Sequence, residues 1–171
     1  KDIEDAIRKD KTPISGNGLP ISQERIRDEF LKGIKQAQSV GYFTQLITKY
    51  NLWDWIFGRL VVTTKPLIET KDPIVLIASL LRSNEPTLIE KTLTNQLRYT
   101  VEEVREIVFL IKFLQLGEDV YKLRERFDVI RMSPETLRSF GALMNIPNKI
   151  IETFLKYRIT TSGEDLMKQG F

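Results

Sequence analysis

The chain has 171 residues, of which 42% are hydrophobic and 29% charged, and its formal net charge is +3. It contains neither Cys nor His, which excludes disulfides, thiol nucleophiles, Ser-His-Asp triads and zinc sites built from His or Cys. No stretch approaches the roughly 18 apolar residues of a transmembrane helix, and no signal-peptide pattern is present. We therefore expect a cytoplasmic protein without a membrane partner.

The first third of the chain shows helical periodicity interrupted by loops. A short amphipathic stretch at residues 3–9 precedes a loop rich in Gly and Pro. Residues 21–38 then place apolar side chains on one helical face, and Ser22 is their expected N-cap. Residues 41–51 repeat that pattern. For residues 52–66, which include a local run of β-branched residues, we predict a short helix followed by a loop.

The most apolar helix is predicted at residues 72–83, "DPIVLIASLLRS". Asp72 suits the N-cap, and Pro73 suits the first helical position, where its missing N–H costs nothing. The apolar residues run almost all round the helix, which is typical of a fully buried element. We expect this helix to form the centre of the core.

Helix starts also mark the remaining elements. Thr87 with Glu90, and Thr100 with Glu103, have the spacing of capping boxes, in which each side chain caps the backbone of the other residue. Further helical patterns cover residues 118–127, 133–145 and 147–157, the second of which starts with Ser133 and Pro134. The sequence therefore predicts an all-α fold, an irregular multi-helix array of about nine or ten helices joined by short loops.

No catalytic or metal-binding constellation is evident. The chain lacks an Asp-x-Asp motif on a strand, as two-metal phosphoryl transfer would require. Acidic pairs do occur at predicted helix starts, where they complement the helix dipole without any catalytic role. These pairs are Glu102/Glu103, Glu118/Asp119 and Glu164/Asp165. We predict neither a catalytic residue nor a metal ligand in this chain.

A basic segment is the better candidate for a functional surface. Residues 121–158 carry eight basic and four acidic side chains, an excess of four that exceeds the net charge of the whole chain. Basic side chains seven residues apart share a helix face and can follow a phosphate backbone. Taken alone, the charge pattern favours the alternative of a solvated face with ion pairs such as Arg124–Asp128. The predicted RNA contacts are Lys149, Lys156, Arg158 and Lys168.

Three large aromatic residues lie close together in the sequence. Trp53, Trp55 and Phe57 have rings that can stack on nucleic-acid bases. Large aromatic side chains in a helical array are more often part of the core. Core packing is therefore the interpretation that the sequence favours.

Two stretches together resemble a known family. The stretch "GLPISQERIRDEFLKGI" at residues 18–34 resembles a neck motif, and "TTSGEDLMKQGF" at residues 160–171 resembles a tail motif. Both motifs are those of class II tRNA nucleotidyltransferases, also called CCA-adding enzymes, and of bacterial poly(A) polymerases. The matching neck positions include Ser22, Glu24, Arg25 and Glu29, and the matching tail positions include Ser162, Gly163 and Asp165. The resemblance assigns structural roles to these residues.

The resemblance implies a neck, body and tail without the catalytic head, that is, a piece of a longer protein. It places the neck at residues 1–50, the helical body at 51–158 and the start of the tail at 159–171. The implied function is to hold the acceptor and TΨC region of tRNA, or another RNA, while the head adds CCA or A residues with Mg²⁺. RNA and the head domain are the implied partners. A stand-alone helical protein-interaction domain without a nucleic-acid role is the alternative.

Overall fold

The computed structural model describes residues 22–65, 67–115 and 119–157. Within these ranges the fold is an all-α array of nine α-helices and one π-helical segment, without a strand, which confirms the predicted fold class. The elements are α2 (Gln23–Gln36), α3 (Val40–Lys49), α4 (Trp53–Phe57), α5 (Pro73–Leu81), α6 (Pro86–Lys91), η1 (Thr92–Gln96), α7 (Val101–Gln115), α8 (Val120–Val129), α9 (Pro134–Leu143) and α10 (Asn148–Lys156).

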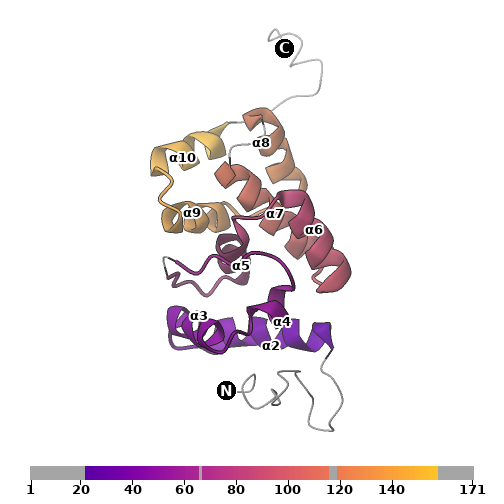
Figure 1. Cartoon of the computed structure of the whole chain (residues 1–171). Helices are drawn as coiled ribbons and strands as arrows, with labels where there is room; N and C mark the ends of the chain where they lie inside the picture. The colour runs from indigo at the N-terminus through magenta and orange to yellow at the C-terminus, as the bar shows by residue number, and fades with distance from the viewer. Residues whose placement is uncertain (1–21, 66, 116–118, 158–171) are drawn as a thin grey trace, which may run out of the picture.

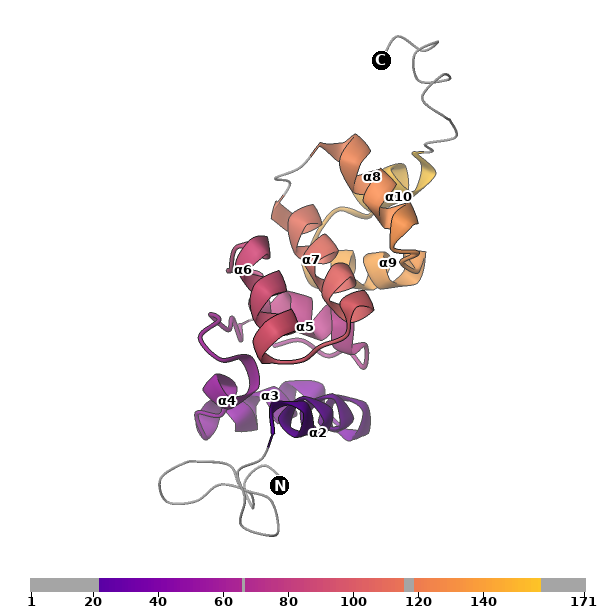
Figure 2. The same ribbon diagram turned by 90° about the vertical axis from the view of Figure 1, so that its right-hand side faces the viewer.

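The helices are stacked in chain order. Figures 1 and 2 show α2, α3 and α4 at one end, α5, α6 and α7 in the middle, and α8, α9 and α10 at the other end. No helix among the described residues has both the length and the apolar composition needed to cross a bilayer.

The expected helix starts are largely confirmed. The Ser22 hydroxyl accepts a hydrogen bond from the Arg25 N–H at 3.2 Å, and the Asp72 carboxylate caps α5. Thr100 and Glu103 form the predicted capping box, with bonds of 2.9 and 3.2 Å in the two directions. These contacts satisfy backbone N–H groups that have no partner within the helix.

The capping box predicted at Thr87 and Glu90 is wrong. Helix α6 begins two residues earlier, with Pro86 in its first turn and Glu85 as an N-cap that makes no side-chain hydrogen bond. Proline at the first helical position fixes a helical φ angle and needs no hydrogen-bond acceptor, so Pro86 determines the start of this helix.

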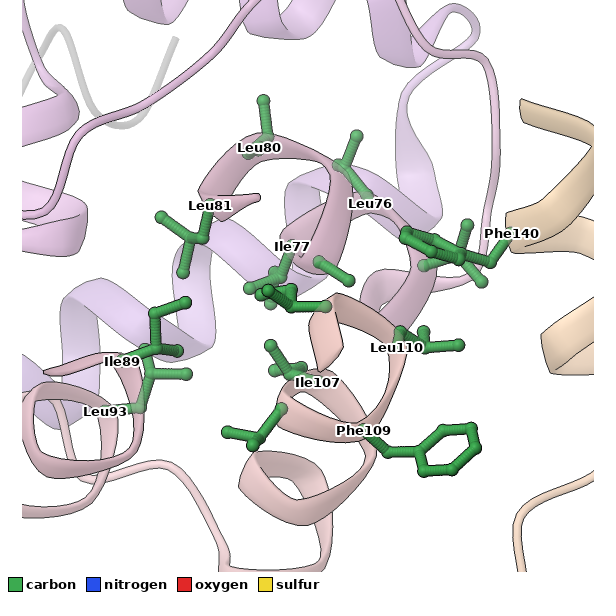
Figure 3. Close-up of a cluster of buried hydrophobic side chains, with 14 of the residues drawn as sticks. Leu76, Ile77, Leu80, Leu81, Ile89, Leu93, Ile107, Phe109, Leu110 and Phe140 are labelled. Carbon is green, nitrogen blue, oxygen red and sulfur yellow. The ribbon is translucent and has the colours of Figure 1, made fainter. Parts of the chain in front are cut away.

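Helix α5 occupies the centre of the core, as predicted. All seven side chains from Val75 to Leu81 are buried, and α5 packs against α7 and also contacts α2 and α9. Figure 3 shows Leu81 beside Ile89 and Leu93, Ile77 above Ile107, and Leu76 next to Phe140. One apolar helix therefore links all three groups of helices.

An aromatic cluster holds the N-terminal helices together. Phe30 of α2 lies 6.1 Å from Phe43 of α3, 6.0 Å from Trp53 and 5.4 Å from Phe57, measured between ring centroids. Phe57 is fully buried, and Trp53 and Trp55 pack against the core. These three aromatics are therefore core residues. The cluster spans the boundary predicted between residues 50 and 51, and the division into neck and body remains a prediction.

Two charged side chains of the segment before α5 hold the corner between α2 and α3. The Glu69 carboxylate accepts hydrogen bonds from the Ser39 hydroxyl at 2.5 Å and from the N–H groups of Val40 and Gly41 at 3.0 and 2.7 Å. Lys71 donates to the carbonyl of Ala37, which follows α2. An anion thus caps the start of α3, while a cation caps the end of α2, as the helix dipoles favour.

We expect the Glu69 contact to make stability depend on acidity. The Ser39 hydroxyl, followed by the backbone N–H groups, lowers the pKa of Glu69 below its usual 4.5. A lowered pKa in the folded state means that the carboxylate stabilises the fold above pH 4.5 and that this contribution is lost as the pH falls below it. Glu69→Gln should lower the urea midpoint at pH 7, and the difference from wild type should shrink at pH 3.

The matched control is Glu24→Gln, because Glu24 lies exposed in the first turn of α2. This variant should change the midpoint less at pH 7. A Glu69→Gln difference that stays constant between pH 7 and pH 3 would contradict the proposed role of the charge.

Candidate nucleic-acid interface

Helix α10 has one buried and one exposed face. Ile151 and Phe154 are buried in the core. The exposed face carries two cations, two hydroxyl groups and one apolar side chain, contributed by Lys149, Ile150, Thr153, Lys156 and Tyr157. The spacing of 149, 153, 156 and 157 keeps these side chains on one side of the helix. The predicted contacts Lys149 and Lys156 therefore share an exposed face.

A second aromatic cluster anchors α10. The Phe154 ring centroid lies 4.9 Å from that of Phe113, 5.8 Å from that of Phe127 and 6.2 Å from that of Phe109. Phe109 and Phe113 belong to α7, and Phe127 to α8. The packing of Phe154 against two other helices gives the exposed face of α10 a defined position.

Arg124 of α8 ties down the C-terminal end of α10. Its side chain donates to the carbonyl oxygens of Tyr157 at 2.7 Å and Leu155 at 3.4 Å, and pairs with Asp128 at 2.6 Å. The guanidinium also lies 4.9 Å from the centroid of Phe127. Only 11% of the side chain is exposed. Arg124 therefore has a structural role, although it belongs to the basic excess counted in the sequence.

Arg138 of α9 neutralises the acidic flank of α10. Its guanidinium donates to Glu152 at 2.9 Å and also pairs with Glu135. This hydrogen bond is the largest cause of a lowered pKa of Glu152. The carboxylate next to the exposed face is consequently engaged by a neighbouring helix, and it offsets less of the charge of Lys149 and Lys156.

The side chains of the basic segment that form no ion pair carry an excess of positive charge, which favours the binding of anions. Within residues 121–157, five basic side chains form no ion pair with a described residue. Glu125 is the single acidic residue of this range that forms no such pair. The five are Lys122, Arg126, Arg131, Lys149 and Lys156. The intramolecular pairs thus use three of the four carboxylates counted in the sequence and only two of the cations.

Several predicted contacts lie outside the described residues. Arg158 and Lys168 belong to residues 158–171, as do the predicted tail positions Ser162, Gly163 and Asp165. Sequence inspection missed Thr153 and Tyr157 as members of the same face. Their spacing from Lys149, at four and eight residues, was the available signal.

The residues of the predicted neck motif lie at the other end of the molecule. Ser22 caps α2, Arg25 and Glu29 form an ion pair at 3.8 Å, and Glu24 lies in the first turn. Figure 1 places α2 far from α10, so these residues and Lys149 belong to different surfaces. The role of Ser22 as a cap is confirmed, as is the predicted pairing of Arg25 with Glu29.

Arg27 is a structural residue that the sequence did not indicate. Its guanidinium pairs with Asp28 at 2.9 Å and donates to the carbonyl of Arg98, which follows η1. The Arg27 side chain thereby joins α2 to the middle helices. This contact spans 71 residues of sequence, so no local pattern could have indicated it.

The described residues contain no group of three or more acidic side chains placed to hold a metal ion. The chain matches no known family model, no curated protein and no solved structure in the three comparisons made. Function is therefore inferred from the α10 face and from the residues that resemble the neck and tail motifs.

Proposed function

We propose that this chain is the RNA-holding helical portion of a nucleotidyltransferase of the CCA-adding and poly(A) polymerase family. The exposed face of α10 is the observation that carries the proposal. Lys149 and Lys156 supply positive charge, and the carboxylate that lies between them in the sequence, that of Glu152, is engaged by Arg138. A cationic helix face is suited to a phosphate backbone, which contributes most of the affinity in nucleic-acid binding.

The neighbouring side chains extend this role. Tyr157 is 38% exposed, so its ring can stack on an unpaired base, and the Thr153 hydroxyl can donate to phosphate or ribose oxygens. The contacts of Phe154 and Arg124 position α10 before RNA arrives. Such preorganisation reduces the entropy lost on binding.

The proposal divides the work between two parts of one protein. The helices hold tRNA, or another RNA, in the cytoplasm, and a separate head domain adds nucleotides from CTP and ATP. Mg²⁺ would be bound by carboxylates of that head, and no step of the reaction is assigned to the residues described above.

Removal of the two lysines should weaken RNA binding and its dependence on salt. The double variant Lys149→Ala/Lys156→Ala should bind a tRNA lacking its CCA end less tightly at low salt. The slope of log K against log salt should fall by about one unit for each phosphate-binding side chain removed. Electrophoretic mobility shifts at several salt concentrations measure both quantities.

The matched control is Lys32→Ala/Lys91→Ala, which removes the same charge from exposed positions on α2 and α6. This control should retain the wild-type slope. Equal losses in the two double variants would show that net charge alone governs binding. Absence of tRNA binding by the wild-type chain at low salt would contradict the proposal and favour the alternative of a helical protein-interaction domain.

A further inference from the structure

The segment between α4 and α5 is paired along one edge only. Three of its residues, each two positions apart, hydrogen-bond to the C-terminal end of α5 and the turn that follows. The bonds join Val61 to the Asn84 side chain (2.9 and 2.7 Å), the Thr63 N–H to the Leu80 carbonyl (2.7 Å) and the Lys65 carbonyl to Arg82 (2.8 Å). This alternation is that of an extended chain.

The residues between these three have backbone groups that face the opposite edge of the segment. In an extended chain the backbone groups of successive residues point to opposite edges, so those of Val62 and Thr64 lie away from the bonds to α5. Neither residue makes a backbone hydrogen bond to any described residue. An extended segment with one unpaired edge is a template for the addition of a strand.

A groove of about 430 Å³ separates this segment from α3. Its walls include three threonines, two lysines and one leucine, namely Thr44, Thr48 and Lys49 from α3 and Thr64, Lys65 and Leu67 from the segment. Trp53 donates to the Thr48 hydroxyl at 2.8 Å, which fixes that wall. The groove therefore lies between a helix and an extended chain, an arrangement that suits an extended peptide.

The charge and polarity of the groove select among peptides. Lys49 and Lys65 are exposed and come from opposite walls. No carboxylate of a described residue lines the groove, because Glu69, the nearest acidic residue of the segment in sequence, is bound to Ser39, Val40 and Gly41. Leu67 is 49% exposed and offers an apolar contact. Acidic side chains alternating with apolar ones fit this lining best.

We propose that this groove binds a short acidic peptide of a partner protein in extended conformation. The peptide adds a strand to the free edge at Thr64, the residue of that edge that lines the groove, and its carboxylates pair with Lys49 and Lys65. The site belongs to the N-terminal group of helices, whereas α10 lies at the opposite end of the molecule (Figures 1 and 2). The proposal is independent of RNA binding by α10 and adds a second kind of partner.

The test uses the whole chain and a fluorescein-labelled peptide of alternating valine and glutamate, followed by fluorescence anisotropy. We expect saturable binding with a Kd below about 1 mM. Lys49→Glu/Lys65→Glu should weaken this binding about tenfold or more, because like charges then face each other. The control Lys32→Glu/Lys91→Glu makes the same charge change at exposed positions outside the groove and should bind as wild type does.

A second peptide tests the strand itself. Proline at alternate positions removes the peptide N–H groups that would pair with the free edge, and this peptide should not bind. Equal binding of the two peptides, or unchanged binding by Lys49→Glu/Lys65→Glu, overturns the proposal, as does a wild-type chain that does not bind the acidic peptide.

Two further measurements address unfolding and nucleic-acid binding. Circular dichroism melts of both double variants establish that weaker peptide binding is not caused by unfolding. A single-stranded oligonucleotide serves as a competing probe: if it binds through Lys49 and Lys65 in place of the acidic peptide, the groove is a nucleic-acid site and the peptide proposal fails.

Discussion

Arg124→Ala is expected to lower the free energy of unfolding by about 3 kcal/mol. Hydrogen bonds from a charged donor contribute about 1.5–3 kcal/mol, and a partly desolvated cation–π contact adds about 0.5–2 kcal/mol. Arg124 combines both, since it binds two carbonyls at the end of α10 and lies over Phe127. The substitution would also leave the Tyr157 carbonyl without its partner. Urea unfolding followed by circular dichroism measures the loss.

Two companion variants separate geometry from charge. Arg124→Lys keeps the charge but cannot reach the two carbonyls and Asp128 at once, so it should recover only a minor part of the stability. Arg126→Ala removes an exposed cation from the same helix and should change stability by less than about 0.5 kcal/mol. Equal losses at positions 124 and 126 would contradict the assignment of Arg124 as the tie between α8 and α10.

Gly33→Ala is expected to destabilise the fold by about 1–3 kcal/mol, although alanine is the better helix former by about 1 kcal/mol. A Cβ atom at position 33 would lie 2.8 Å from Cε1 of Phe43, with Cζ closer still. The Phe43 ring stacks on Phe30, and it cannot withdraw without disturbing that contact. Thermal and urea unfolding of the variant measure the effect.

The reciprocal substitution tests the cause. Phe43→Leu shortens the side chain that meets position 33, so Gly33→Ala should cost less in that background than in wild type. The coupling energy from the double-mutant cycle should be at least about 0.5 kcal/mol. If Gly33→Ala stabilises the protein by about the 1 kcal/mol of helix propensity, Phe43 moves freely and the interpretation fails.

Local signals in the sequence predicted most helix starts. Ser22, Asp72 and Ser133 cap helices as expected, because an N-cap depends on a few consecutive residues. The wrong prediction of an N-cap at Thr87 also has a local cause, because Pro86 occupies the first helical position of α6. The all-α class followed from the apolar periodicity, which does not depend on how the helices are arranged.

Contacts between distant segments could not be predicted. The bonds of Glu69 to the start of α3 and of Arg27 to Arg98 join residues far apart in sequence. The same limit affected the candidate interface. Lys149 and Lys156 were found from their spacing, but the ties of Arg124 and Arg138 to α10 depend on how α8 and α9 pack. The i,i+4 spacing did indicate the Arg124–Asp128 ion pair, which the structure contains.

The central position of α5 has a consequence for synthesis of the chain. Helix α2 is made before α5 and can pack with it at once, whereas α7 and α9 cover its remaining faces. Part of the apolar surface of α5 consequently stays uncovered until residue 143 at the end of α9 has been translated. Transiently exposed apolar surface of this kind promotes aggregation and chaperone binding. A ribosome that pauses between α5 and α9 would prolong the stage at which apolar surface of α5 is exposed and the nascent chain is most prone to aggregate.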